Sequence, residues 1–104
     1  MLFVTTETIA GKEILESLGT VRGSTVRARN IGSDLFAGLK NIIGGEISEY
    51  TKLLADAREQ AIQRMLADAV KINADAVINV RFTTSQVMQG AAEIMAYGTA
   101  VKIS

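Results

Sequence analysis

The apolar residues between positions 46 and 72 recur at the spacing of an α-helix. Their broad stripe and the absence of glycine in this segment predict a long helix, which Asn73 ends. Three alanines within the stripe, Ala57, Ala61 and Ala69, are small enough to let the helix lie close to a sheet. The sequence therefore predicts a helix that covers one face of a sheet.

A second apolar stripe, at positions 31–43, predicts another helix. Asn30 is suited to its N-cap, because an Asn side chain accepts hydrogen bonds from the first free backbone N–H groups. The pair Gly44-Gly45 ends it, since glycine adopts the left-handed conformation that satisfies the last carbonyls. A glycine pair before a helix also suits a phosphate-binding loop, but no Gly-Lys-Ser/Thr sequence follows, so a turn between helices is favoured.

Three segments have the composition of β-strands: residues 2–5, 76–84 and 92–103. Gln89-Gly90 predicts a turn between the last two. The last strand is apolar on both faces: one carries Met95, Tyr97, Val101 and Ile103, and the other carries Ile94, Ala96 and Ala100. Because one helix layer covers only one face, a neighbouring subunit is the simplest cover for the other.

Residues 11–29 are compatible with two structures. The spacing of Ile14, Leu15 and Leu18 favours a helix that Gly19 would cap. Glycine at positions 11, 19 and 23 and the β-favouring run at 20–26 favour a long strand bent by its glycines. The residues alone do not decide between the two.

Composition narrows the chemistry open to this chain. Its 104 residues make one domain and include no Cys, His, Pro or Trp, which excludes thiolate and imidazole metal sites and Ser-His-Asp triads. Eleven basic and eleven acidic residues cancel, so there is no electrostatic footprint for nucleic acid. No apolar run is long enough for a transmembrane segment. Without cysteines or a signal sequence, we expect a cytoplasmic protein.

Glu49, Asp56 and Glu59 come closest to an acidic cluster, because a helix places all three on one side. Three carboxylates suit a hard cation such as Mg²⁺ or Ca²⁺. Lys52 lies between them and can pair with its neighbours, so a solvated helix face is favoured. The same carboxylates, together with Asp75, support an alternative hypothesis, an enzyme that needs a bound cation or cofactor.

Arg27 and Arg29 share one face if the chain there is extended, and Arg22 is near in sequence. Such a group of arginines suits the binding of an anion, and a ring of subunits would repeat the group once in every subunit. Ion pairing at the surface or at an interface is favoured over anion binding.

Short stretches that cover nearly the whole chain, in order, resemble one known family. They are Gly11-Lys12-Glu13-Ile14, Asn30-Ile31, Asp34-Leu35-Phe36-Ala37-Gly38, Ile43-Gly44-Gly45, Tyr50, Ala57-Arg58, Ala74-Asp75-Ala76-Val77 and Gly98-Thr99-Ala100-Val101. This ordered set resembles the YbjQ-like family of small bacterial and archaeal proteins, whose function is uncharacterised. The resemblance implies a two-layer α+β fold like a dodecin subunit, with helices on one face of an antiparallel sheet. It also implies a homopentameric ring with strands lining the inside, and a long bent strand over residues 11–29.

The chain departs from the family pattern where Asn73 and Asn79 stand in place of glycines. If those glycines shape a pocket in relatives, that pocket is altered here. The family is sometimes labelled as binding heavy metals, but soft metals favour thiolate or imidazole ligands, which this chain lacks. Met65, Met88 and Met95 offer only thioethers and suit core and turn positions. No metal ligand is therefore predicted.

On these grounds we expect a non-enzymatic homopentamer that binds a small ligand or ion at subunit interfaces or in the central channel. One chain of this size has little room for a pocket of its own. The polar residues of the matched stretches, Tyr50, Arg58 and Asp75, are the candidates for binding the ligand, with a structural role favoured for each. The sequence names no cofactor, and the only partners that it predicts are further copies of the chain.

Overall fold

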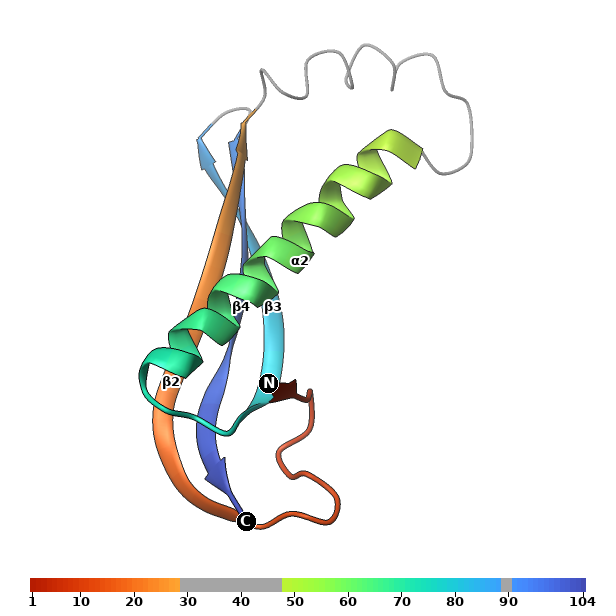
Figure 1. Cartoon of the computed structure of the whole chain (residues 1–104). Coiled ribbons are helices and arrows are strands. Elements are labelled where there is room, and N and C mark those ends of the chain that lie inside the picture. Colours follow the sequence, from red (N-terminus) through yellow and green to blue (C-terminus); the bar gives the residue numbers. More distant parts are fainter. Residues whose placement is uncertain (29–47, 89–90) are drawn as a thin grey trace.

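The computed structural model describes residues 1–28, 48–88 and 91–104 (Figure 1). Its elements, in chain order, are β1 (Leu2–Phe3), β2 (Ile14–Ala28), α2 (Ser48–Lys71), β3 (Ala76–Met88) and β4 (Ala91–Ile103). The helix predicted at 31–43, with Asn30 and its glycine pair, and the turn at Gln89-Gly90 lie outside the described residues. The described residues thus form an α+β fold of one helix and a four-stranded sheet. None of their helices is long and apolar enough to cross a membrane.

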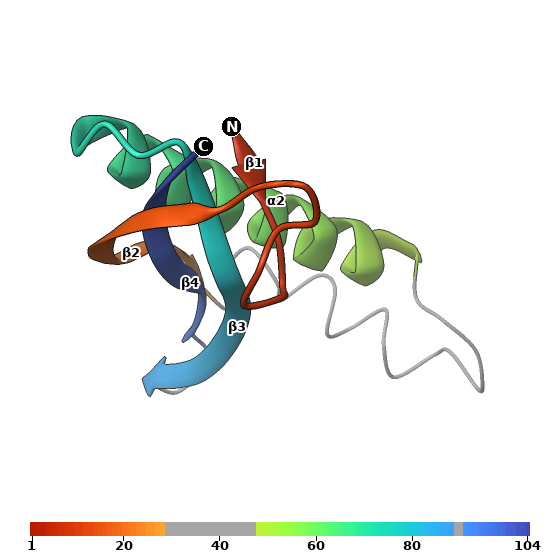
Figure 2. The same cartoon turned by 90° about the horizontal axis from the view of Figure 1, so that it is seen from below.

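The four strands form one mixed sheet in the order β1-β3-β4-β2. β4 pairs antiparallel with both β2 and β3, whereas β1 pairs parallel with β3. The prediction of a wholly antiparallel sheet is therefore wrong at one edge. A parallel pair needs a long connection, and here β2 and α2 lie between β1 and β3 in the chain. Figure 2 shows this arrangement from below, with β1 next to β3 at the edge of the sheet that lies away from β2.

β2 is the long bent strand that the family resemblance implies, and it resolves the choice that the residues left open. Its pairing with β4 is irregular between Ile14 and Glu16 and again between Ser17 and Gly19. Gly19 has a φ of 106°, which favours glycine. Each bulge adds a residue and changes the face of the side chains that follow. The bulges therefore explain why apolar residues at the start of β2 have a helix-like spacing.

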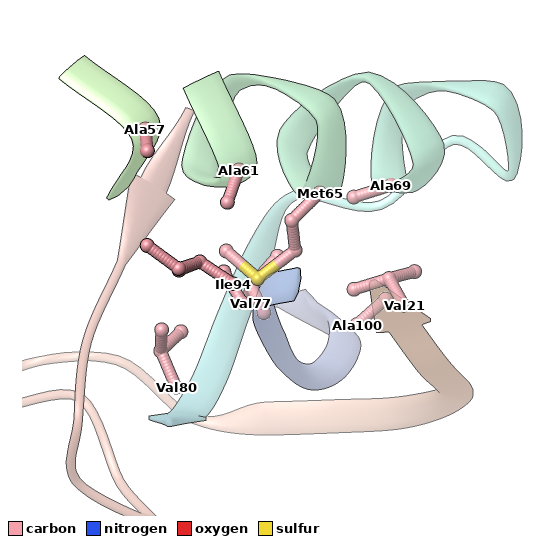
Figure 3. Close-up of a cluster of buried hydrophobic side chains, with 10 residues drawn as sticks. Val21, Ala57, Ala61, Met65, Ala69, Val77, Val80, Ile94 and Ala100 are labelled. Carbon is pink, nitrogen blue, oxygen red and sulfur yellow. The ribbon is translucent and has the colours of Figure 1, made fainter. Parts of the chain in front are cut away.

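α2 covers one face of the sheet and lies mainly across β2 and β4 (Figure 1). Among the residues of α2 whose burial is described, Ala57, Ala61, Met65 and Ala69 are fully buried (Figure 3). They confirm the predicted close approach of small residues to the sheet. The approach is tightest at Gly23, where a Cβ atom would lie 2.6 Å from the carbonyl carbon of Arg64 and closer to other backbone atoms of α2. Only glycine leaves room there for the helix backbone.

β3 changes face at Asn79. Its pairing with β4 shifts between Ile78 and Arg81, and Asn79 has a φ of 54°. Ile78 therefore faces away from α2 whereas Val80 packs with the α2 core, although simple alternation predicts both on one face. Asn73 also has a positive φ, of 59°. Since Asn adopts this conformation more readily than other residues with a side chain, the backbone shape that favours glycine is kept at both positions.

The sheet face opposite α2 has a small core of its own at the end near the C-terminus. This core contains Ile9, Ala76, Ile78 and Val101, with Val4, Ile14 and Ile103 packed around them. The N-terminal segment of the same chain thus covers Val101 and Ile103, so these two residues give no evidence for a neighbouring subunit. Sequence periodicity does not predict this cover, because Ile9 lies in an irregular connection between β1 and β2.

Candidate functional site

Beyond this second core, the same face carries mostly polar side chains on three adjacent strands. Cross-strand pairing arranges them in rows: Thr20 with Thr99, Arg22 with Tyr97 and Arg81, Ser24 with Met95 and Thr83, and Val26 with Glu93 and Ser85. Residues directly opposite one another share a face. The intervening residues of β2, Val21, Gly23 and Thr25, are the ones buried under α2. We call the residues of these rows the open face.

The row of Arg22, Tyr97 and Arg81 concentrates positive charge on the open face. Tyr97 lies on the middle strand, with one arginine on each side, and all three residues are exposed. The Arg81 guanidinium is oriented by two carbonyls, because its Nη1 donates to the oxygens of Thr5 at 2.7 Å and Val80 at 2.9 Å. Adjacent strands lie about 4.8 Å apart, so the backbones of the two arginines are roughly 10 Å from each other. Two arginines in one row of a sheet face suit an anionic ligand.

The three residues predicted to bind a ligand are spread along α2 and beyond its end. Tyr50 belongs to the first turn of α2, and its side chain lies outside the described part of the chain. Arg58 is exposed on α2, and the end of the helix lies roughly 20 Å beyond it at 1.5 Å per residue. Asp75 follows that end. A site that contains all three therefore needs more than one copy of the chain.

Asp75 joins the turn after α2 to the end of β4. Its carboxylate accepts a hydrogen bond from the N–H of Ile103 at 3.0 Å and lies 3.7 Å from the ammonium group of Lys102. Its own N–H donates to the carbonyl of Val101 at 2.9 Å. The ion pair is exposed and is worth less than about 1 kcal/mol. The two backbone hydrogen bonds are therefore the main structural contribution of Asp75.

The acidic residues of α2 do not converge within the part of the chain that the structure describes. Asp56 and Glu59 are exposed, and Glu59 accepts a hydrogen bond from Gln63 at 2.9 Å. The side chain of Glu49 lies outside the described residues. Among those that are described, no three Asp or Glu residues are placed to hold a metal ion. This arrangement is typical of a solvated helix face.

Arg27 faces α2 and not the open face. Its Nη2 lies 3.4 Å from the side-chain oxygen of Gln60, and the hydroxyl of buried Thr25 donates to the same oxygen at 3.4 Å. Arg22 lies on the other side of β2, because its position differs from that of Arg27 by five along a strand of period two. Arg22 therefore does not join Arg27 in an anion site on one face, and Arg29, which the sequence predicts on the same face as Arg27, lies outside the described residues.

The open face is missing from the sequence-based predictions. Arg81 and Thr83 alternate with apolar residues, which is a signal for one polar side of β3. Their neighbours on β2 carry no such signal, because residues 11–29 fit a helix as well as a strand. Only the strand pairing brings Arg22 beside Tyr97, which is 75 positions later in the chain.

Comparison with known proteins gives a consistent family match. A family model named YbjQ, with the description "Putative heavy-metal-binding", matches residues 1–104. A UPF0145 protein of Methanosarcina acetivorans is 61% identical over 103 residues, which cover 99% of this chain and 97% of the relative. A UPF0145 protein of Archaeoglobus fulgidus is 59% identical, with coverages of 99% and 95%. The match thus spans the full length of both relatives apart from a few residues.

The fold is also found among solved structures. One example is the crystal structure of a protein of unknown function from Pediococcus pentosaceus, assigned to the DUF74 family, with a TM-score of 0.65 and 17% sequence identity. The similarity covers 100% of this chain and 98% of the other. At this level of identity the likeness concerns the fold alone.

The residues of this chain do not fit the heavy-metal description of the matching model. Soft metals prefer thiolate, imidazole or thioether ligands, and the sequence has no Cys and no His. The thioether of Met65 is fully buried in the core, and Met95 is half-buried on the open face. The side chain of Met88 lies outside the described residues. The described residues of one chain therefore supply no set of donor atoms for a soft metal.

Proposed function

The chain belongs to the YbjQ-like family, and from that premise we propose that it is a cytoplasmic, non-enzymatic homopentamer that holds a small ligand between its subunits or in a central channel. One observation carries this proposal: the open face, which is polar over three adjacent strands although it lies on a sheet. A sheet face without cover is expected to be polar only if it meets water. The wall of a water-filled channel is such an environment.

The charges of the open face favour an anion as the ligand. Among the described residues of this face, each subunit contributes the guanidinium groups of Arg22 and Arg81 and the carboxylate of Glu93. In a ring, the excess of positive charge would repeat with every subunit. A channel lined by one sign of charge concentrates ions of the other sign.

The alternative function, an enzyme based on carboxylates, gains no support from the part of the chain that the structure describes. Such an enzyme requires two or more carboxyl groups that converge in a cleft. Of the four candidates, Asp56 and Glu59 are exposed on α2, Asp75 binds the backbone of β4, and the side chain of Glu49 lies outside the described residues.

Native mass spectrometry on untagged protein tests the proposal directly, because it reports subunit number and bound mass together. We expect five chains with a constant additional mass. Arg22→Gln should lose that mass and keep the subunit number, whereas the control Lys71→Gln, which removes the same charge from the exposed end of α2, should keep both. A monomer would contradict the assembly, and additional mass that survives Arg22→Gln would contradict the role of the open face.

A further inference from the structure

The two edges of the sheet differ in how they are protected. β2 forms one edge, and β1 lies beside β3 at the other. β1 covers only the first part of β3: Leu2 and Phe3 pair with Ala76 and Val77, and the last backbone bond on this side joins Val80 to Val4. Beyond Val80, no strand among the described residues lies on the outer side of β3. With respect to residues 1–28, 48–88 and 91–104, the backbone groups there have no partner strand and can pair with another.

The middle of the β2 edge is held by side chains of α2. Arg64 Nη1 donates to the carbonyl of Ser24 at 2.6 Å, and the carboxylate of Asp68 accepts from the backbone N–H of Arg22 at 3.3 Å. Arg64 and Asp68 are four residues apart, so they lie on the same flank of the helix. A strand that added to this edge would have to displace both contacts. The charged pair therefore closes the edge at Arg22 and Ser24.

The outer half of β3 has the opposite character. Residues 82–88 read Phe-Thr-Thr-Ser-Gln-Val-Met, with no charge, proline or glycine and with several β-favouring residues. Residues 81–86 are all exposed, and Phe82 is 44% exposed. Uncharged segments of this length and composition are prone to add strands when they lie at an edge. Native proteins normally blunt such an edge with charge or proline, or cover it.

We propose that a strand from a second copy of this chain adds to the outer edge of β3 at residues 82–86. The charge balance supports a second copy as the occupant, since eleven basic and eleven acidic residues cancel and copies do not repel one another. An edge without charge offers nothing to a strongly charged partner. This proposal rests on the homopentamer proposed above and names the edge that joins its copies. Arg64 and Asp68 would then prevent strand addition at the other edge, on β2.

The substitution Thr84→Lys tests this contact, because a lysine on an edge strand opposes strand addition. We expect the variant to shift from the oligomer mass toward that of one chain, 11.1 kDa, in size-exclusion chromatography with light scattering. Two controls should keep the wild-type mass: Ala67→Lys, which adds the same charge to an exposed position on α2, and Thr84→Val, which keeps the strand uncharged. Circular dichroism checks that all three variants fold.

Hydrogen exchange separates this proposal from the proposed function. Alternate amides of residues 82–86 point away from β4, and we call them the outer amides. In the wild-type oligomer the outer amides should exchange slowly, and they should exchange fast in Thr84→Lys. A wild-type pentamer whose outer amides exchange fast, or a Thr84→Lys variant that assembles as the wild type does, would overturn the β3 contact while the ring stands. A wild-type monomer would overturn both.

Discussion

Replacing Gly23 by alanine should destabilise the protein far more than a single methyl group does elsewhere on a strand. The new Cβ would lie 2.6 Å from the carbonyl carbon of Arg64 and nearer still to the backbone of Ala61 and Met65. Carbon atoms in good contact are about 3.5–4.0 Å apart, so α2 must withdraw by roughly 1 Å. The obstructing atoms belong to the backbone, so no rotation of a side chain can relieve the clash.

The expected cost follows from the residues that the displaced helix would uncover. Overpacking a core costs typically about 1–3 kcal/mol, and here the whole buried face of α2 shares the displacement, which places the loss near the upper end, about 3 kcal/mol. For a domain of this size, that corresponds to a fall in melting temperature of roughly 12–24 °C. Stabilities of small domains are about 5–15 kcal/mol, so the variant should still fold.

Urea unfolding followed by circular dichroism measures this loss. Wild type and variants must be compared at one protein concentration, because assembly makes stability concentration-dependent. Ser24→Ala is the matched control: it changes the next residue, whose side chain belongs to the open face, and should alter the free energy of unfolding by less than about 0.5 kcal/mol. A loss below about 1 kcal/mol for Gly23→Ala would show that α2 does not lie against the β2 backbone.

Three further predictions concern single contacts. Asn79→Ala should cost about 1 kcal/mol because of its positive φ, whereas Asn79→Gly should be nearly neutral, and thermal unfolding of both variants checks this. Asp75→Ala should lower the free energy of unfolding by about 1 kcal/mol, because the N–H of Ile103 loses its acceptor. Asp75→Asn keeps an acceptor and should lower it less. Equal losses in urea unfolding would contradict this. Replacing both Arg64 and Asp68 by serine should free the β2 edge and produce species larger than the wild-type oligomer in light scattering, and an unchanged mass would refute their protective role.

The elements with strong periodicity could be predicted from the sequence almost to the residue. The apolar stripe at 46–72 corresponds to α2 at Ser48–Lys71, and the strand predicted at 92–103 corresponds to β4 at Ala91–Ile103. Both depend on local patterns, which a single sequence contains. The strand predicted at 76–84 continues to Met88. The pattern ends too early because Ser85 and Gln86 are both polar and Val87 and Met88 are both apolar, which is no alternation.

The features that define the candidate site depend on contacts between distant residues. The bulge at Asn79 reverses the faces of β3, so Ile78 and Val80 lie on opposite sides despite their spacing. The parallel pairing of β1 and the rows of the open face arise from register, for which one sequence gives no direct signal. The bent strand of residues 14–28 could be predicted only from the family resemblance, because composition and spacing fit a helix there as well as a strand.

The second core also constrains the order in which the protein can form during synthesis. Its members are far apart in the sequence: Ile9 lies in the connection between β1 and β2, whereas Ala76, Ile78 and Val101 belong to β3 and β4. A ribosome releases the chain from its N-terminus, so Ile9 cannot meet all of its partners until Val101 has been synthesised. Contacts of such long sequence separation also form slowly after release. Until β3 has been synthesised, the backbone groups of Leu2 and Phe3 have no partner strand, and they are free to pair with another chain.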